Sequence, residues 1–220
     1  MALPLLVVGF VMANKALSHS ETILLEARSA WLEEGDLDEA MRLYRLVVHR
    51  ESGKKSAAVA RVELAGLFER GLDQPVRSAR MLEVAHDEDP SHPESAEWLM
   101  KAADLASAQG RAHWAQKLWE RVADTHPEQA NKALLTLGRE LLAQGDQVAA
   151  YASYQRVALD EATAEERSLA RIGMSICLER MGDRDAALAE LDELSREDPM
   201  WRQRRDRLQV RHEASSGSLW

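Results

Sequence analysis

The feature that most constrains the fold is a repeated triplet: a glycine, an alanine five residues later, and a large side chain four residues after that. Glycine permits the backbone conformation that ends one helix and turns the chain. The alanine and the large residue then lie on one face of the next helix, facing its partner. The pattern therefore predicts a series of packed helical hairpins. The four triplets are Gly35, Ala40, Tyr44; Gly110, Ala115, Trp119; Gly145, Ala150, Tyr154; and Gly182, Ala187, Leu191.

The spacing of the glycines indicates how many hairpins the chain holds. The four glycines are separated by 75, 35 and 37 residues, so the gap of 75 must contain one further unit. That unit runs from about Ser56 to Pro90, and its Gly71 and Pro75 predict a distorted turn. Pro90, Pro127 and Pro199 follow polar residues and are placed to close the second helix of three units.

This arrangement resembles the tetratricopeptide repeat family, whose units average about 34 residues with small and aromatic side chains at set positions. Arg28 departs from the pattern, because it stands where the first unit would have a small residue. The resemblance implies an all-α fold: a right-handed α-α superhelix of about five helical hairpins with a C-terminal capping helix. The best-matching stretches are Ala102-Ala103, Gly110, Ala115, Trp119, Val122 and Pro127, then Leu137-Gly138, Leu141, Gly145, Ala150, Tyr154 and Val157.

We expect four parts along the chain. An apolar segment covers residues 1–20, the repeat array covers 21–199, a capping helix covers 200–212 and a tail covers 213–220. The five arginines between 202 and 211 form a basic patch on the cap, which would solubilise the last unit or bind anionic lipid or an acidic groove. The array divides into units 21–54, 56–90, 91–127, 128–162 and 163–199.

The apolar stretch 2–13 admits three interpretations. As a helix it would span about 18 Å, short of the roughly 30 Å hydrocarbon core, although Lys15 could snorkel and let a membrane anchor continue. A secretory signal is the second, although no basic residue precedes the apolar run. The third is packing on protein. If it is an anchor, Lys15 and Arg28 follow it and place the repeats in the cytoplasm. The anchor candidates are Leu3, Leu5, Leu6, Val7, Val8, Phe10, Val11 and Met12.

Several kinds of chemistry are disfavoured. The net charge of −9 repels nucleic acid. The single cysteine, Cys177, lies in an apolar run and reads as a buried side chain. No two histidines are four residues apart, as a zinc site on one helix requires. The polar run from His86 to Asp89 is interpreted as a solvated helix end. With no phosphate loop, nucleophile elbow or dinucleotide motif, we expect no metal, no cofactor and no enzyme activity.

The family resemblance implies a groove, lined by the first helix of each hairpin, that binds a protein or peptide. Chaperone-binding members clamp a terminal carboxylate with Lys and Asn, but Leu25 and Ser29 stand at the corresponding places here. The groove becomes apolar toward the C-terminal half, which suits an amphipathic helix, unless those residues pack against the capping helix. The groove candidates are Met100, Asp104, Lys132, Leu135, Arg139, Leu142, Leu169, Ile172 and Ile176.

The tryptophans divide into two groups. Trp31 and Trp119 occupy repeat core positions, whereas Trp98 and Trp114 are interface candidates. Three functions remain open: a membrane-associated scaffold that assembles or stabilises a membrane complex, a structural subunit whose N-terminus inserts into a partner, and a regulatory subunit of an enzyme.

Overall fold

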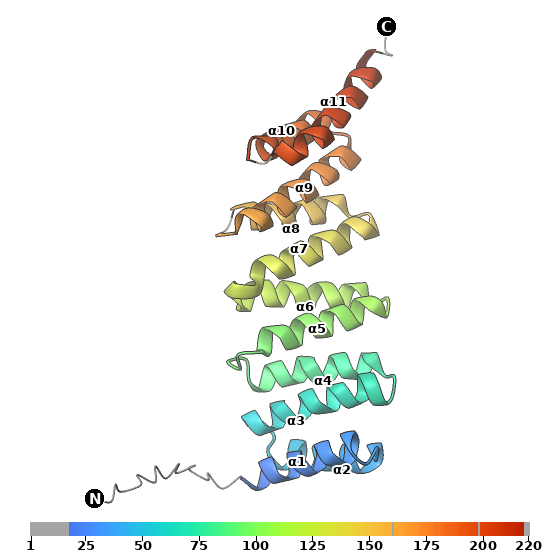
Figure 1. Cartoon of the computed structure of the whole chain (residues 1–220), viewed down its shortest axis with the longest axis vertical. Coiled ribbons are helices and arrows are strands. Elements are labelled where there is room, and N and C mark those ends of the chain that lie inside the picture. The colour runs from blue at the N-terminus through green and yellow to red at the C-terminus, as the bar shows by residue number, and fades with distance from the viewer. Residues whose placement is uncertain (1–17, 160, 198, 218–220) are drawn as a thin grey trace, which may run out of the picture.

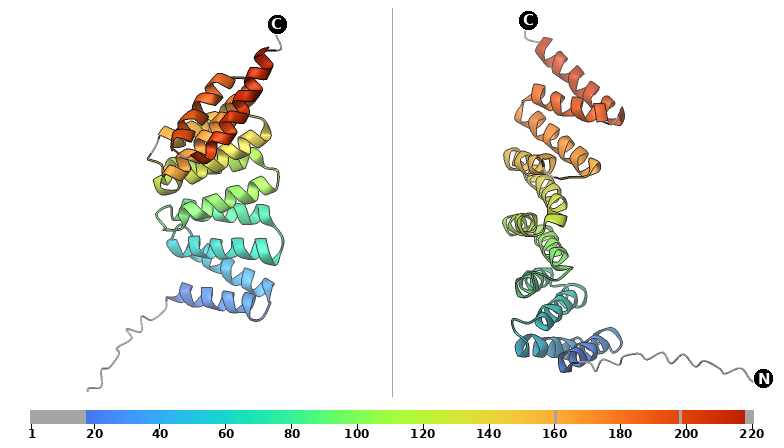
Figure 2. Two further views of the ribbon diagram at one scale, coloured as in Figure 1. Left: turned by 45° about the horizontal axis from the view of Figure 1, so that its top comes forward. Right: turned by 90° about the vertical axis from the view of Figure 1, so that its left-hand side faces the viewer.

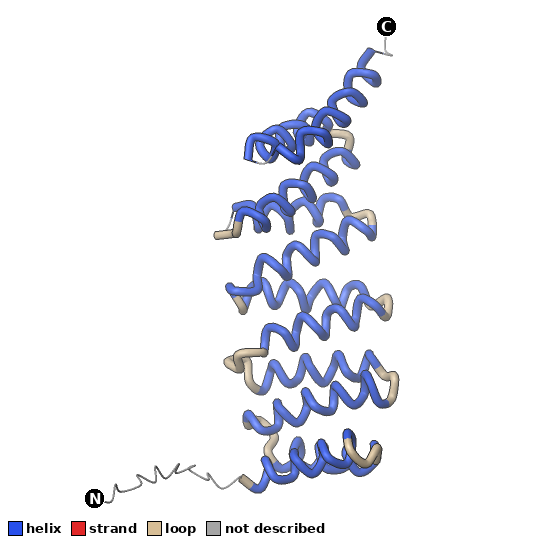
Figure 3. Tube along the Cα trace, viewed as in Figure 1, coloured by secondary structure: helices blue, strands red, loops and turns tan. Residues whose placement is uncertain are grey.

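A computed structural model describes residues 18–159, 161–197 and 199–217. Within these residues every regular element is helical (Figure 3), as the sequence predicted. The helices stack along one long axis and run to and fro across it, with the first and the last described helices at opposite ends of the stack (Figures 1 and 2). The chain is therefore an all-α solenoid.

Ten helices form five consecutive antiparallel pairs. Each helix packs against the helix before it and the helix after it along the chain. Each pair has a first and a second helix, and we use these terms below. The pairs are α1 (His19–Leu32) with α2 (Leu37–Arg50), α3 (Lys55–Gly66) with α4 (Pro75–Glu88), α5 (Ser95–Ala108) with α6 (Ala112–Thr125), α7 (Pro127–Gln144) with α8 (Gln147–Leu159), and α9 (Ala164–Met181) with α10 (Arg184–Glu197).

The triplet glycines make the turns between paired helices. All four have φ between 69° and 89°, the left-handed conformation in which glycine lacks the steric cost of a Cβ. At Gly145 the chain closes a typical helix C-cap, because Asp146 N–H donates to the Leu141 carbonyl at 2.9 Å. The predicted role of the glycines is confirmed at Gly35, Gly110, Gly145 and Gly182.

The remaining triplet positions form the core. The four alanines are fully buried, and the large residues that follow them are at most 6% exposed. A further buried apolar residue three positions on extends each stripe, as the period of a helix requires. The large residues are Tyr44, Trp119, Tyr154 and Leu191, and the residues after them are Val47, Val122, Val157 and Leu194.

The second pair has the irregular turn that Gly71 and Pro75 predicted. The helix α3 continues as a π-helical turn, η1 (Leu67–Gly71), and Asp73 then adopts a positive φ of 50° before Pro75 begins α4. Trp31 of α1 lies against the glycines at either end of this turn: a Cβ added at Gly66 would lie 3.3 Å from its ring, and one added at Gly71 would lie 3.7 Å from its Nε1. The absence of a side chain at both positions leaves room for the indole.

The last helix, α11 (Arg202–Gly217), follows a short 3₁₀ turn, η2 (Pro199–Trp201). It packs on α10 through Leu208, which is 2% exposed and joins a cluster with Leu191 and Leu194. This helix covers the final hairpin and then projects beyond the stack (Figure 1). The expected C-terminal capping helix is therefore present.

Candidate functional site

The residues proposed for the groove lie on the first helices α5, α7 and α9. The side chains of Asp104, Lys132, Arg139 and Leu169 are exposed, and that of Leu135 is half-buried. We call these five residues the first-helix face. They come from the first helices of three consecutive hairpins.

The other groove candidates lie deeper. Met100 and Leu142 are 8% and 9% exposed, so their side chains belong to the core. Ile172 and Ile176 are half-buried, and Ile172 packs against the apolar cluster that Leu178 forms with residues of α10 and with Leu208 of α11.

Charge is organised along the first-helix face. Asp104 is exposed as a residue, but the protein atoms packed around its carboxylate remove part of its hydration and raise its pKa, and this desolvation outweighs the opposing effects of the Trp119 indole and of the Arg139 and Lys132 charges. The two basic residues are thus close enough to act on this carboxylate from the next hairpin. The middle of the face combines one acid with two bases, while Leu135 and Leu169 provide apolar contacts.

Polar contacts also join neighbouring first helices. Arg28 of α1 donates to Glu63 of α3, with Nη2 2.5 Å from Oε1. This contact explains why an arginine stands where the repeat pattern has a small residue. Farther along, Lys101 Nζ lies 2.6 Å from Glu69 Oε2, and Ser107 donates to Glu140 at 3.1 Å. These cross-links orient successive hairpins.

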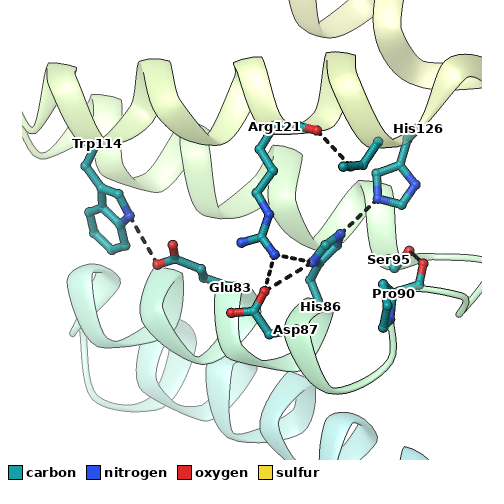
Figure 4. Close-up of polar contacts among 9 residues, drawn as sticks. Glu83, His86, Asp87, Pro90, Ser95, Trp114, Arg121 and His126 are labelled. Carbon is teal, nitrogen blue, oxygen red and sulfur yellow. Dashed lines mark hydrogen bonds and ion pairs between the residues drawn. The ribbon is translucent and has the colours of Figure 1, made fainter.

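A second polar cluster joins α4 to the end of α6 (Figure 4). Its members are His86, Asp87, Arg121 and His126, which we call the histidine junction. His86 is 3% exposed, and its Nε2 lies 3.0 Å from Nε2 of His126. The expectation of a solvated helix end is therefore wrong for His86, because the last turn of α4 is covered by the next hairpin.

The histidine junction places both partners of His86 within hydrogen-bonding distance. Arg121 Nη2 lies 3.2 Å from Nδ1 of His86, and Asp87 Oδ1 lies 3.5 Å from the same nitrogen. On the other side of the ring, Nε2 of His86 faces Nε2 of His126. Burial first, and then the Arg121 charge, lower the pKa of both histidines.

Asp89 is buried as well, contrary to the expected solvated end. It is 4% exposed, and its Oδ1 accepts a hydrogen bond from Ser91 at 2.9 Å. Across the parts of the chain that the structure describes, no group of three or more His, Cys, Asp or Glu side chains is positioned to hold a metal ion. Cys177 is fully buried, as predicted, and burial raises its pKa to about 11.

The two tryptophans considered for an interface differ. Trp98 is buried and stacks on His92 with ring centroids 4.4 Å apart. Trp114 is half-buried, and its Nε1 donates to Glu83 at 3.2 Å (Figure 4). It lines an open cleft of about 440 Å³ with Arg80 and Arg111. Trp119, at 2% exposure, is a core residue as expected.

Solved structures with the same fold are repeat proteins. The crystal structure of MamA superposes with a TM-score of 0.56 at 16% identity, over 83% of this chain and 94% of that chain. A tetratricopeptide repeat protein from Parabacteroides merdae superposes with a TM-score of 0.54 at 16% identity, over 86% of this chain and 72% of that one. The chain therefore has the tetratricopeptide repeat fold that its sequence predicted.

Sequence comparison adds nothing to this result, since neither the protein-family models nor the curated proteins gave a match. The proposed anchor residues lie in 1–17, outside the described residues. Among the described helices, none combines the length and the apolar character needed to cross a membrane.

Proposed function

We propose that the chain is a non-catalytic scaffold that binds a protein or a helical peptide on its first-helix face. The observation that carries this proposal is the stripe of accessible side chains contributed by α5, α7 and α9. A ligand lying across three hairpins would contact all of them, and an extended or helical segment has the required length. The family resemblance favours the same use of the first helices.

The chemistry of the face suggests an amphipathic ligand. Lys132 and Arg139 are accessible bases that would pair with an acidic side chain of the ligand, and Asp104 would pair with a basic one. Leu135 and Leu169 would cover its apolar side. Charge pairs of this kind determine orientation and partner choice more than total affinity.

The test uses a photo-reactive amino acid at Leu135 in the intact chain, with capture from the native membranes. We expect one dominant cross-linked partner, and we expect the double variant Lys132→Glu/Arg139→Glu to lose it. Lys117→Glu is the matched control, because Lys117 is exposed on the second helix α6, away from this face. Equal labelling from a probe at Leu159, which is exposed on α8, would contradict the proposed surface.

We further propose that residues 2–13 hold the scaffold at a membrane, with the repeats in the cytoplasm, where it assembles or stabilises a membrane complex. The uncharged apolar run and the later Lys15 and Arg28 support this assignment. Fractionation of cells that express the chain with and without residues 2–17 tests it. An unchanged soluble distribution would exclude the anchor.

The alternative is a structural subunit whose apolar N-terminus inserts into a partner protein. The stretch of about 18 Å favours it, since that length is short for a bilayer of roughly 30 Å. In that case the isolated full chain should aggregate or co-purify with its partner. A monodisperse chain in detergent-free buffer would argue against insertion.

A further inference from the structure

The first helix of the solenoid exposes an apolar face bordered by acids. Leu25 and Leu32 of α1 are 48% and 68% exposed and lie seven residues apart, so they are on the same side of the helix. Glu26 and Glu33 are exposed beside them. We call these four residues the N-end face.

Positions equivalent to these leucines are less exposed inside the array. Leu25 precedes its turn glycine by ten residues, as do Met100, which is 8% exposed, and Leu135 and Ile172, which are half-buried. Leu32 precedes its glycine by three residues, as do Leu142, which is 9% exposed, and the half-buried Ser107 and Glu179. The two leucines of the N-end face are thus more exposed than their equivalents in later hairpins.

The C-terminal end of the solenoid exposes an apolar face bordered mainly by bases. Met200 of η2 is 69% exposed, and Val210 of α11 is 64% exposed on the side of that helix opposite the buried Leu208. Both line an open hollow of about 970 Å³ together with Arg204, Arg207 and Asp206, and Asp206 is paired with Arg205. We call Met200, Arg204, Arg207 and Val210 the C-end face. Within the described part of the chain neither arginine makes an ion pair, whereas Arg205 pairs with Asp192 and Asp206.

We propose that the C-end face of one copy docks on the N-end face of a second copy, so that the solenoid continues from chain to chain. The helices α1 and α11, which carry most of the two faces, lie at opposite ends of the stack (Figure 1). Each face has two exposed apolar side chains, and the two faces carry opposite charges. Burial of the four apolar side chains drives the contact, and the arginines and glutamates fix its orientation.

Charge also distinguishes this arrangement from a symmetric dimer. Pairing two C-end faces would bring Arg204 and Arg207 of both copies together, and pairing two N-end faces would oppose Glu26 and Glu33. Like charges at such short range destabilise a contact. A head-to-tail contact uses different surfaces on the two copies, so it does not close on itself and adds chains in sequence.

The test compares two blocked variants of the full chain. Leu25→Asp/Leu32→Asp removes the N-end face, and Met200→Asp/Val210→Asp removes the C-end face; all four side chains are exposed, so folding should persist. In sedimentation equilibrium we expect the wild-type mass to rise with concentration past that of a dimer. Each variant alone should stay monomeric, and an equal mixture should stop at the heterodimer.

Charge reversal gives an independent measurement. Arg207→Glu should weaken association about five- to tenfold, and Glu26→Arg placed in the same chain should restore it, because the two positions meet between copies. Val148→Asp, at a side chain 71% exposed on α8, is the control and should leave association unchanged.

Three results would overturn the proposal. A wild-type chain that stays monomeric at every concentration has no such contact. A blocked variant that dimerises alone pairs through like faces or another surface. In the third, a cysteine substituted at Leu25 is protected from a thiol reagent in the monomer, and removal of residues 1–17 abolishes the protection. That result would mean that the chain covers its own N-end face.

Discussion

The ring of Tyr154 occupies the space where Gly173 has no side chain: a Cβ built at Gly173 would lie 2.5 Å from the ring carbons. Gly138 meets the other edge of the ring in the same way, at 2.8 Å. Tyr154 is therefore held between α7 and α9, and the close approach of the helices depends on both glycines. The repeat pattern predicted the tyrosine as a large core residue, and the structure shows that its ring packs between Gly138 and Gly173.

We predict that Gly173→Ala lowers the free energy of unfolding by about 1–3 kcal/mol, the usual cost of overpacking a core. Alanine favours a helix over glycine, so a simple propensity effect would have the opposite sign. Urea denaturation followed by circular dichroism measures the change. Tyr154→Leu in the Gly173→Ala background should recover part of the loss, because the shorter side chain vacates the ring's position. A stabilised Gly173→Ala variant would contradict the packing described here.

A second prediction separates backbone conformation from sterics. Gly145 has a φ of 84°, and a Cβ there would meet no atom within 4 Å. Gly145→Ala should therefore cost about 1–2 kcal/mol through the left-handed backbone alone. Gly145→Asn should cost less, since Asn tolerates this conformation. Equal losses for both variants in urea denaturation would indicate a different cause.

Cys177 provides a probe of local opening. It is fully buried and its pKa is raised to about 11, chiefly by burial, so the reactive thiolate is scarce near pH 8. Labelling by a disulfide reagent should be slow in the native chain and should accelerate sharply across the urea transition. A native rate equal to that of the unfolded chain would show that α9 opens readily.

The sequence predicted the features that depend on neighbours in the chain. Turn glycines such as Gly145 and paired core positions such as Ala150 and Tyr154 follow from helix geometry, because their spacing alone puts them at a turn or on one face. The irregular second unit was also evident from Gly71 and Pro75. These signals depend on residues that are close together in the sequence, so a single sequence is enough to detect them.

Features that depend on contacts between hairpins were not predicted. His86 and His126 are 40 residues apart and no periodicity links them, so their contact follows only from how α6 lies on α4. The same limit applies to the predicted groove: Met100 and Arg139 were both predicted to line it, yet one is buried and the other exposed. Repeat spacing predicts on which face of a helix a residue lies, but it does not predict how much of that face the next hairpin buries.

The histidine junction predicts a pH dependence of stability. The pKa of His86 and of His126 is lowered in the folded chain, mainly by burial, relative to an unfolded value of about 6.5. As the pH falls through that value, the unfolded chain binds protons that the folded chain does not. The stability that the two neutral histidines contribute is therefore fully present above about pH 6.5 and is lost as the pH falls below that value toward their lowered folded-state pKa.

The matched variant is His126→Gln, whose amide can donate a hydrogen bond to His86 Nε2 or accept one from it but does not titrate. Its free energy of unfolding, measured in urea from pH 7.5 to 5, should decline less steeply than that of the wild type. The raised pKa values of Asp104 and Glu190 act in the opposite direction, since protonation on acidification favours the folded chain at those sites. Both carboxylates are present in either protein, so the difference between the two curves isolates the histidine. Parallel curves would show that protonation of His126 does not disturb the joint between α4 and α6.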